Sequence, residues 1–419
     1  MSIGSLKIFL EHTGTCFLCR NGLYFSFEQI PSSRGPLMTM RTIAVTTRKH
    51  WRDFFGLRRV IYRNDPAVVH PLKIMERQLL DVDAHPFFET ASREVFICYD
   101  SKNQAVGRIV AIKDDLHNDF CKDKLGFFGF YEVADRTDAN EIHDSLMAAA
   151  EAWLKERGCD SIRGPVNPSM KSEFGVVVHG NQVPPTIMLA HTPARYDDLL
   201  KEGDFAVAKS FYAFHSTKEE HHYRSEEEWA KLESSLEKIS KRFPQLKMRT
   251  VDKNNFNETF REINELANEV RKDDWGYVPF TDSELQFMVK SLRPVVRFDM
   301  IHVAYWDNQL VGYIVNIPDV NWALRKTIGT WDWIRLPQLL FWLKRTPRTR
   351  VFLLGVKKEF RNRGVSTSLI KGLVDKRLEY DEWEFSWVEE DNLRSMRAIA
   401  RAAKVEKFKT FRIYERPMR

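Results

Sequence analysis

The sequence predicts an α/β (α+β) chain of two successive units that repeat one order of strands and helices. Short apolar runs typical of buried strands alternate with segments whose apolar residues fall on one helical face. The chain has 419 residues, enough for two or three domains, and 43% hydrophobic residues can fill their cores. We expect a unit at 41–216, a charged connector helix at 217–245 and a unit at 246–419, after a disordered or weakly ordered extension at 1–40.

The first unit is expected to open with a strand and a helix and to continue as a hairpin. The polar run Asp100–Gln104 predicts the hairpin turn, and Thr137-Asp138-x-x-Glu141 resembles a capping box at a helix start. The expected strands are 41–45, 95–99, 105–112, 125–133 and a strand end at 161–165, and the expected helices are 51–62 and 137–157.

Two polar segments of the first unit bear on function. The turn at 132–138 is acidic and has no glycine, so a phosphate group would be repelled there. The loop at 164–175 is long and rich in polar residues, and such loops are often functional. We predict that Asn167 and Glu173 face a substrate; a structural turn packed on its own prolines explains the same loop equally well.

The second unit repeats the pattern with more aromatic residues. The expected strands are 246–251, 300–305, 310–317, 351–356, 383–388 and 408–414, and the expected helices are 256–271, 283–292, 365–380 and 393–403. The segment 275–280 is an aromatic loop, and we predict that Trp275 and Tyr277 line an acceptor site; ordinary core packing is the alternative for each ring.

The turn between the expected strand 351–356 and its helix has the properties of an anion cradle. Residues 357–363 carry four basic side chains against one acid, Glu359, and Gly364 follows. The first N–H groups of a helix lack partners inside it, and a glycine lets the backbone approach a phosphate closely. A solvated basic turn is the plainer explanation of the same residues.

This turn resembles the acyl-CoA loop of the GCN5-related N-acetyltransferase (GNAT) superfamily, which reads Arg/Gln-x-x-Gly-x-Gly/Ala. The first Arg and the first Gly are matched, and Ser366 stands at the second small position. The resemblance implies two tandem domains, each with a mixed, mostly antiparallel central sheet flanked by helices. It also implies that the first unit is a degenerate domain without a cofactor loop.

The resemblance assigns cofactor-binding roles to residues of the second unit. It implies that the CoA pyrophosphate lies on the loop, that the pantetheine arm lies along the preceding strand, and that Asn392 helps to fix that arm. The loop residues are Arg361, Asn362, Arg363, Gly364, Val365 and Ser366, and the strand residues are Leu354, Gly355 and Val356. The tyrosine that many members carry in the helix at 393–403 is absent.

From the resemblance we predict an N-acyltransferase that uses acetyl-CoA or another acyl-CoA. A small-molecule or peptide amine would attack the thioester directly, and a carboxylate would remove its proton. Three acids end the expected strand 383–388, and we predict that Glu390 or Asp391 is the base; a solvated strand end is the alternative. A non-catalytic acyl-CoA-binding module remains open, and so does an aminoacyl-tRNA-dependent transferase of the peptidoglycan-bridge type.

Composition narrows the class of protein. A net charge of +6 is mild for this length, so nucleic acid is not an expected partner. An odd count of five cysteines argues against a disulfide framework and favours a reducing, cytoplasmic location. The single Cys16-x-x-Cys19 and the pair His221-His222 lack further ligands at metal-binding spacing, so we predict no metal.

No apolar run is long enough to span a bilayer. The segment from Trp331 to Arg345 comes nearest to one, but it is short and carries charges. A lid or a substrate wall is the favoured prediction for it, with an interfacial helix as the alternative.

Overall fold

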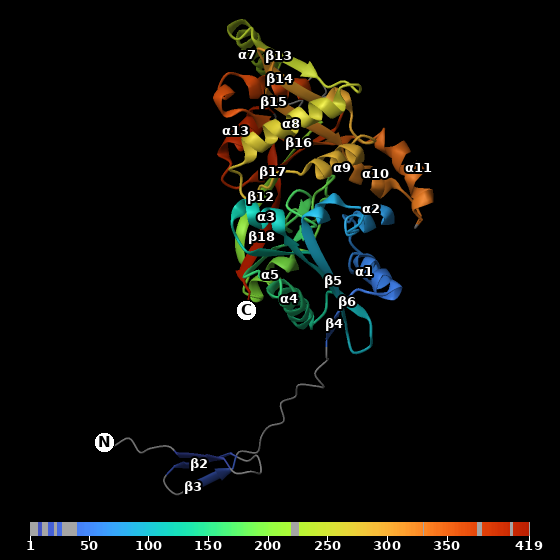
Figure 1. Cartoon of the computed structure of the whole chain (residues 1–419), viewed down its shortest axis with the longest axis vertical. Coiled ribbons are helices and arrows are strands. Elements are labelled where there is room, and N and C mark those ends of the chain that lie inside the picture. Colours follow the sequence, from blue (N-terminus) through green and yellow to red (C-terminus); the bar gives the residue numbers. More distant parts are fainter. Residues whose placement is uncertain are drawn as a thin grey trace, which may run out of the picture. The chain divides into compact units, whose positions relative to one another are not determined.

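The computed structural model describes residues 7–10, 16–20, 23–26, 40–218, 226–329, 331–374, 379–402 and 405–418. The chain divides into two compact units, Met1–Thr39 and Met40–Arg419 (Figure 1). In the first, strands β1 (Lys7–Leu10), β2 (Cys16–Arg20) and β3 (Leu23–Ser26) pair antiparallel. The weak order expected of residues 1–40 stays a prediction, and His221 and His222 lie outside the described residues.

The unit Met40–Arg419 is built on one large sheet. We call residues 40–218 the N-terminal half and residues 226–418 the C-terminal half. The strands of the N-terminal half are β4 (Arg41–Ala44), β5 (Ala91–Tyr99), β6 (Ala105–Asp114), β7 (Leu125–Val133), β8 (Ser161–Gly164), β9 (Val166–Asn167), β10 (Glu173–Phe174), β11 (Val176–His179) and β12 (Ala206–Thr217). Those of the C-terminal half are β13 (Leu246–Thr250), β14 (Ile301–Trp306), β15 (Gln309–Pro318), β16 (Arg348–Val356), β17 (Glu382–Glu389) and β18 (Glu406–Pro417).

The strand order confirms the predicted fold and joins its two sheets into one. The order is β13-β14-β15-β16-β17-β12-β18-β8-β7-β6-β5-β4, and β11 also pairs with β18. Among the described strands of this sheet, β16–β17 and β7–β8 are the parallel pairs, and the other pairs are antiparallel. Strand β12 of the N-terminal half pairs with β17, and β18 of the C-terminal half pairs with β8, so each half completes the sheet of the other.

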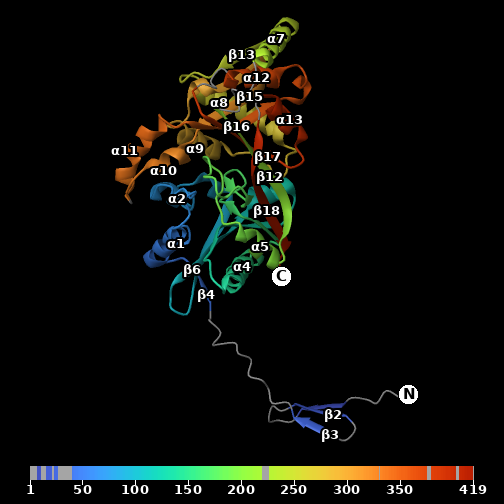
Figure 2. The same cartoon turned by 180° about the vertical axis from the view of Figure 1, so that it is seen from behind.

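Helices cover both faces of the sheet (Figures 1 and 2). In the N-terminal half they are α1 (Arg48–Ile61), α2 (Lys73–Gln78), α3 (Asp115–Cys121), α4 (Ala139–Lys155) and α5 (Arg195–Glu202). Apolar residues of α4 recur every fourth position, at Ile142, Leu146, Ala150 and Leu154, and all are buried. Alternate residues of β5 divide between the cores under α1 and under α4, as the two faces of a strand require.

The helices of the C-terminal half are α7 (Glu226–Arg242), α8 (Phe256–Arg271), α9 (Asp282–Leu292), α10 (Val320–Lys326), α11 (Asp332–Leu343), α12 (Val365–Val374) and α13 (Leu393–Ala402). A capping box formed by Thr281 and Glu284 starts α9. Phe256, Phe260 and Ile263 of α8 pack on one face of the sheet, and Leu369 of α12 packs on the other.

The parallel pair of β16 and β17 positions the site. Strands β16 and β17 pair from Arg348 with Glu382 to Val351 with Phe385, and then the register ends. Beyond Val351, β16 keeps its antiparallel partner β15 as far as Val356. Among the described residues, no strand pairs with the other edge of residues 352–355, so this edge can receive hydrogen bonds from a ligand, while the carbonyl oxygen of Val356 already accepts from Arg361 Nε.

Candidate active site

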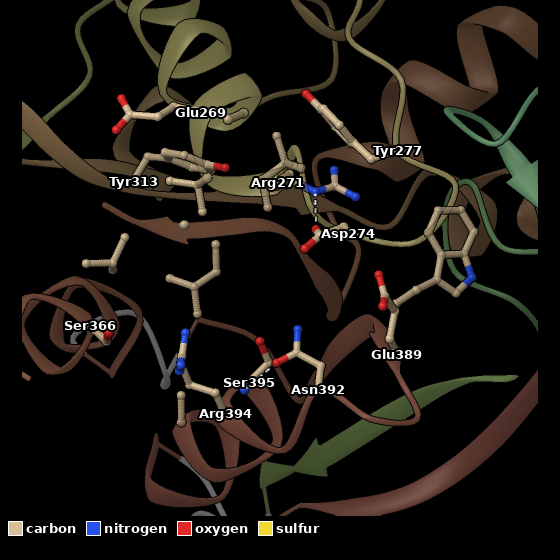
Figure 3. A pocket seen from close by; sticks show the side chains of 18 of the residues that line it. Glu269, Arg271, Asp274, Tyr277, Tyr313, Ser366, Glu389, Asn392, Arg394 and Ser395 are labelled. Atoms are coloured by element: carbon tan, nitrogen blue, oxygen red, sulfur yellow. Dashed lines mark hydrogen bonds and ion pairs between the residues drawn. The ribbon is translucent and has the colours of Figure 1, made fainter. Parts of the chain in front are cut away.

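A cavity of about 1360 Å³ opens where β16 and β17 part (Figure 3). Its walls come from the end of β16, the loop that follows, the first turns of α12 and α13, helix α8, and the loop after α8. Of the predicted cofactor residues, Leu354, Gly355, Val356, Arg361, Asn362, Gly364, Ser366 and Asn392 line this cavity, while Arg363 and Val365 do not.

The loop before α12 presents backbone donors to the cavity. Asn362 and Gly364 have positive φ, +62° and +82°, which turns the chain sharply into the helix. Among the described residues, no backbone carbonyl accepts from the N–H groups of residues 362–367, and the first N–H of α12 with such a partner is that of Ser368, bonded to Gly364. These donors lie at a helix N-terminus, where the helix dipole favours an anion.

Gly364 meets a steric limit as well as a conformational one. A Cβ at this position would come within 2.6 Å of Ile239, because α7 packs over the loop. Ile239 also lines the cavity. The spacing of the loop residues predicted the glycine. The contact of α7 with the loop could not be predicted, because α7 lies more than a hundred residues earlier in the chain and no sequence motif indicates the contact.

The cations at this end of the cavity differ in part from those predicted. The Arg361 side chain folds back, and its Nε donates to the carbonyl oxygen of Val356 over 3.1 Å. Arg363 lies over the ring of Trp306. Arg394 and Arg397, one turn apart on α13, are exposed and line the cavity. They are not among the predicted cofactor residues, although two basic residues three positions apart just after Asn392 were a usable signal.

Asn392 immediately precedes α13 and caps it through its side-chain oxygen, which leaves its side-chain nitrogen available to a ligand in the cavity. Its Oδ1 accepts from the backbone N–H of Ser395 over 3.0 Å, which satisfies one of the orphan donors of the helix. Figure 3 shows Asn392 and Ser395 on the wall below the open strand edge. Ser395 is the small hydroxyl residue of a helix that has no tyrosine.

Tyr313 of β15 is a buried hydroxyl at the open strand. The residue pairs with Gly355, and a Cβ on Gly355 would come within 2.5 Å of the phenol oxygen. Among the described residues the hydroxyl has no hydrogen-bond partner, and burial raises the pKa of Tyr313 above its ordinary range. Tyr313 lines the cavity, but nothing in the sequence distinguishes it from a core tyrosine.

The three acids at the end of β17 have different environments. Burial, and then the charge of Asp274, raise the pKa of Glu389 to about 6, and Glu389 faces the cavity. Glu390 is exposed, lies outside the lining and accepts from the backbone N–H of Ser210. Asp391 lines the cavity mouth, where an ion pair of 2.7 Å with Lys209 lowers its pKa. A carboxylate with a pKa near neutrality suits a general base, which favours Glu389.

The opposite wall carries a charge pair and a tyrosine from α8 and the loop after it. Arg271 Nε lies 3.0 Å from a carboxylate oxygen of Asp274, and its guanidinium lies over the ring of Tyr277. Tyr277 lines the cavity and donates its hydroxyl proton to Asn268. Trp275 also lines the cavity, so the structure brings both predicted aromatic residues to it.

Aromatic rings from both halves meet at the far end. Phe174 stacks on Trp387 with ring centroids 4.0 Å apart, and Phe211 lies between Phe174 and Trp275. All four line the cavity. The N-terminal half thus supplies part of the wall, through Phe174 of the predicted loop 164–175 and Phe211 of β12.

Asn167 and Glu173 lie outside the cavity lining. Asn167 Oδ1 accepts from the backbone N–H of Phe130 over 2.6 Å, and Asn167 Nδ2 donates to Glu173 Oε1 over 3.4 Å. Burial raises the pKa of Glu173, against the opposing charge of Arg58. The structure therefore places this pair inside the N-terminal half.

The segment that holds these two residues fills the gap between β7 and β8. Those strands pair in parallel from Leu125 to Phe127 only, just as the pairing of β16 with β17 ends after Val351 in the other half. Beyond that point the chain's own β9 enters, so closely that a Cβ on Gly129 would overlap the carbonyl oxygen of Val166. The Oδ1 of Asn167 accepts from the backbone N–H of Phe130 in β7, so this strand N–H is already bonded within the chain.

A group of side chains that could ligate a metal lies apart from the cavity. His117, Cys121 and Asp123 bring ligand atoms within 4.8 Å of one another, but none of them lines the cavity. Cys98, Cys121 and Cys159 are free thiols. In the part of the chain that the structure describes, no helix has the length and apolar character needed to cross a bilayer.

Comparison with known proteins gives matches over most of the chain. The family model described as Acetyltransferase (GNAT) family matches residues 260–403. A protein of Caulobacter vibrioides named bacterial ceramide synthase is 27% identical over 390 residues, covering 90% of this chain and 98% of that protein. Protein YghO of Escherichia coli is 27% identical over 373 residues, covering 87% and 92%.

Two solved structures share the fold. The GCN5-related glucosamine N-acetyltransferase region of a fungal multi-domain β-N-acetylglucosaminidase superposes with a TM-score of 0.54 and 13% identity, over 91% of this chain and 38% of that chain. A tandem GNAT protein from the clavulanic acid biosynthesis pathway gives 0.52 and 11%, over 91% and 99%.

The two halves share one fold, and one of them keeps an open strand edge above a helix N-terminus. With the family match, this arrangement is that of an enzyme of the acyltransferase class. The matched region, 260–403, contains that edge, the loop and α13. Residues 260–403 match the GNAT family model, and the chain shares its fold with a tandem GNAT protein.

Proposed function

We propose that the protein transfers an acyl group from acyl-CoA to an amine acceptor inside the cavity. The observation that carries the proposal is that three features share this cavity. They are the open edge of β16, the loop 362–367, whose N–H groups have no backbone acceptor among the described residues, and the guanidinium groups of Arg394 and Arg397. CoA is complementary to all three, because its pantetheine amides match a strand edge and its phosphates match N–H donors and guanidinium groups.

The proposed reaction is a direct displacement at the thioester. The amine nitrogen attacks the carbonyl carbon, and the carboxylate of Glu389 accepts a proton from the amine as the C–N bond forms. The C–S bond then breaks, and the leaving thiolate takes a proton from the hydroxyl of Tyr313. Helix α13 has no tyrosine that could donate this proton. Glu389 returns its proton to water, and Tyr313 regains one from water, so no proton is gained or lost overall.

We propose long-chain substrates for this reaction. The relative named bacterial ceramide synthase supports this choice, because a ceramide is the amide of a fatty acid with a long-chain amino alcohol. The stacked rings of Phe174 and Trp387 offer an apolar wall, and about 1360 Å³ exceeds the roughly 300–1,000 Å³ of an ordinary ligand pocket. Acetyl-CoA with a small-molecule or peptide amine, as predicted from the sequence, is the competing choice.

Calorimetry with acetyl-CoA and octanoyl-CoA tests cofactor binding in the full chain. The double variant Arg394→Ala, Arg397→Ala should weaken both ligands by roughly tenfold for each arginine, since each loses a charge-assisted contact with phosphate. The double variant Lys253→Ala, Arg261→Ala, which changes two exposed cations outside the cavity lining, is the control and should bind as the wild type does. A folded wild type that binds neither ligand contradicts the proposal.

Turnover is measured as thiol release together with mass spectrometry of the amide. We expect sphinganine with a long-chain acyl-CoA to give faster amide formation than acetyl-CoA with a small amine. The reverse preference would support acyl transfer but contradict the proposal that the substrates are long-chain. Tight binding of CoA thioesters without amide formation from any amine would favour the non-catalytic module.

A further inference from the structure

Helix α11 turns an apolar stripe toward solvent. Trp333, Leu336, Leu340 and Phe341 follow one another at helical spacing and are all exposed, while Arg335 and Leu339 on the opposite face are buried. Trp331, at the start of the helix, is 61% exposed, and Trp333 is 74% exposed. This is the reverse of an ordinary surface helix, whose apolar stripe faces the core. We call Trp331, Trp333, Leu336, Leu340 and Phe341 the α11 surface.

A second helix extends the same exposed region. Both carboxylate oxygens of Asp332 accept backbone N–H groups at the start of α2, from Lys73 over 3.0 Å and from Ile74 over 2.8 Å. The side chain of Ile74 is exposed, so it adds to the apolar area beside α11. Figures 1 and 2 both show α11 at the margin of the unit, beside α10 and away from the sheet.

Basic groups lie directly on the aromatic rings of this region. Lys73 Nζ lies 5.3 Å from the ring centre of Trp331, and the guanidinium of Arg345 lies 3.8 Å from that of Phe341. Lys344 and Arg345 are exposed at the end of α11. Residues 320–345 hold five basic side chains against one acid, Asp332, whose oxygens are already engaged with α2.

We propose that the α11 surface docks the protein on the surface of a bilayer that contains anionic phospholipids. Tryptophan with aliphatic side chains suits the boundary between head groups and acyl chains, and the rim of lysine and arginine suits negatively charged head groups. None of these residues lines the cavity, so the proposal does not depend on the proposed function. The protein then binds reversibly to the surface of a membrane.

Flotation of the full chain with vesicles tests the proposal. Vesicles of phosphatidylcholine with a quarter phosphatidylglycerol are compared with vesicles of phosphatidylcholine alone. We expect the wild type to float with the anionic vesicles and to release at high salt, because salt screens the contacts of Lys344 and Arg345. The double variant Leu336→Asp, Leu340→Asp should bind at least roughly tenfold more weakly.

A matched control removes the ambiguity of adding charge to a surface. Phe120 and Val207 are exposed to similar extents, 45% and 41% against 48% for each leucine, and they lie on other elements. The control Phe120→Asp, Val207→Asp should bind vesicles as the wild type does. Circular dichroism and thermal melting verify that both double variants are folded.

Three results would overturn the proposal. They are a wild type that floats with neither vesicle, a Leu336→Asp, Leu340→Asp variant that floats as well as the wild type, and a wild-type dimer that this variant converts to monomers. The last would make the α11 surface an interface between copies of the chain. Acyl transfer to a water-soluble amine, measured without vesicles, should be unchanged in the Leu336→Asp, Leu340→Asp variant. Failure of the docking proposal can therefore be distinguished from failure of the proposed function.

Discussion

In the sequence, Glu389 is one of three consecutive acids and nothing distinguishes it, but in the structure its carboxylate is largely buried at the cavity. Burial in the cavity and the neighbouring charge of Asp274 raise its pKa to about 6, because both disfavour the ionised form. A base must be ionised to accept a proton. The contribution of Glu389 to the proposed reaction is therefore lost as pH falls through about 6, and it is fully present above that value, where the carboxylate is ionised.

The pH profile of kcat/KM checks this role. We expect a tenfold loss per pH unit below about 6, and Asp274→Asn should move the bend to lower pH because it removes the like charge. Glu389→Gln should lower kcat by roughly 10²–10⁴-fold. Glu390→Gln is the control, because the amide oxygen can still accept from Ser210. A bend that persists in Glu389→Gln would assign it to another group.

Tyr313→Phe separates catalysis from stability. Removal of the hydroxyl should lower kcat by roughly 10²-fold if it protonates the leaving thiolate. The free energy of unfolding should stay constant or rise by up to about 1 kcal/mol, because the hydroxyl is buried without a partner among the described residues. Urea denaturation measures the second quantity. Tyr305→Phe, whose hydroxyl bonds to Glu262 outside the cavity lining, is the control and should leave kcat unchanged.

At this scale, sequence reasoning could find residues whose roles depend on local spacing. Gly364 and Asn392 lie at fixed distances from a strand end and a helix start, so their positions could be predicted, and both line the cavity. The choice among Glu389, Glu390 and Asp391 could not, because it depends on burial and on Lys209, about 180 residues away. Their catalytic roles stay predictions.

At the scale of elements, the segment β9–β10 distinguishes the two halves. Both halves have a parallel strand pair that parts after a few residues. In the C-terminal half the gap becomes the cavity, whereas in the N-terminal half Val166 and Asn167 occupy it. The acidic turn at 132–138 predicts that this half has no cofactor loop, and this stays a prediction. The sequence could not show that the chain's own backbone fills the space.

Asn167→Ala tests this interpretation against a role in substrate binding. The N–H of Phe130 would lose its acceptor in a largely buried place, so the free energy of unfolding should fall by about 1–3 kcal/mol. Urea denaturation measures this loss, and the Kd of octanoyl-CoA and the KM of the amine should stay within twofold of the wild type. A raised KM with unchanged stability would instead support the prediction that Asn167 faces a substrate.

The strands and helices themselves were largely predictable, because they follow periodic apolar patterns. The expected helix 256–271 coincides with α8, and the expected strand 351–356 forms the end of β16. Helices α10 and α11 were not recognised as a pair, since their apolar residues do not all face a core. A stripe that faces water has the same period as one that faces the interior.

At the scale of the whole molecule, the halves share their edges. Strand β12 pairs with β17, and β18 pairs with β8, so the sheet has no boundary where the sequence suggests one. Pairing between residues 206–217 and 406–417 spans about two hundred positions, and a single sequence carries no local signal for it. The tandem arrangement could be predicted, but the exchange of strands could not.

Unfolding should reflect this sharing. We expect urea to unfold residues 40–419 in one transition, with tryptophan fluorescence and far-ultraviolet circular dichroism changing together, because neither half retains a complete sheet without the other. Octanoyl-CoA should raise the midpoint of that single transition. Two separate transitions, with only one of them raised by the ligand, would show that the halves are independent.

The same exchange imposes an order on biosynthesis. The ribosome completes the N-terminal half long before β18 emerges, yet that half lacks an inner strand until residues 406–417 arrive. Its β8 must wait with an unpaired edge while nearly two hundred further residues are made. The nascent chain is therefore most exposed to misassociation midway through translation, and a premature stop close to its end would leave the earliest-made half as incomplete as the last.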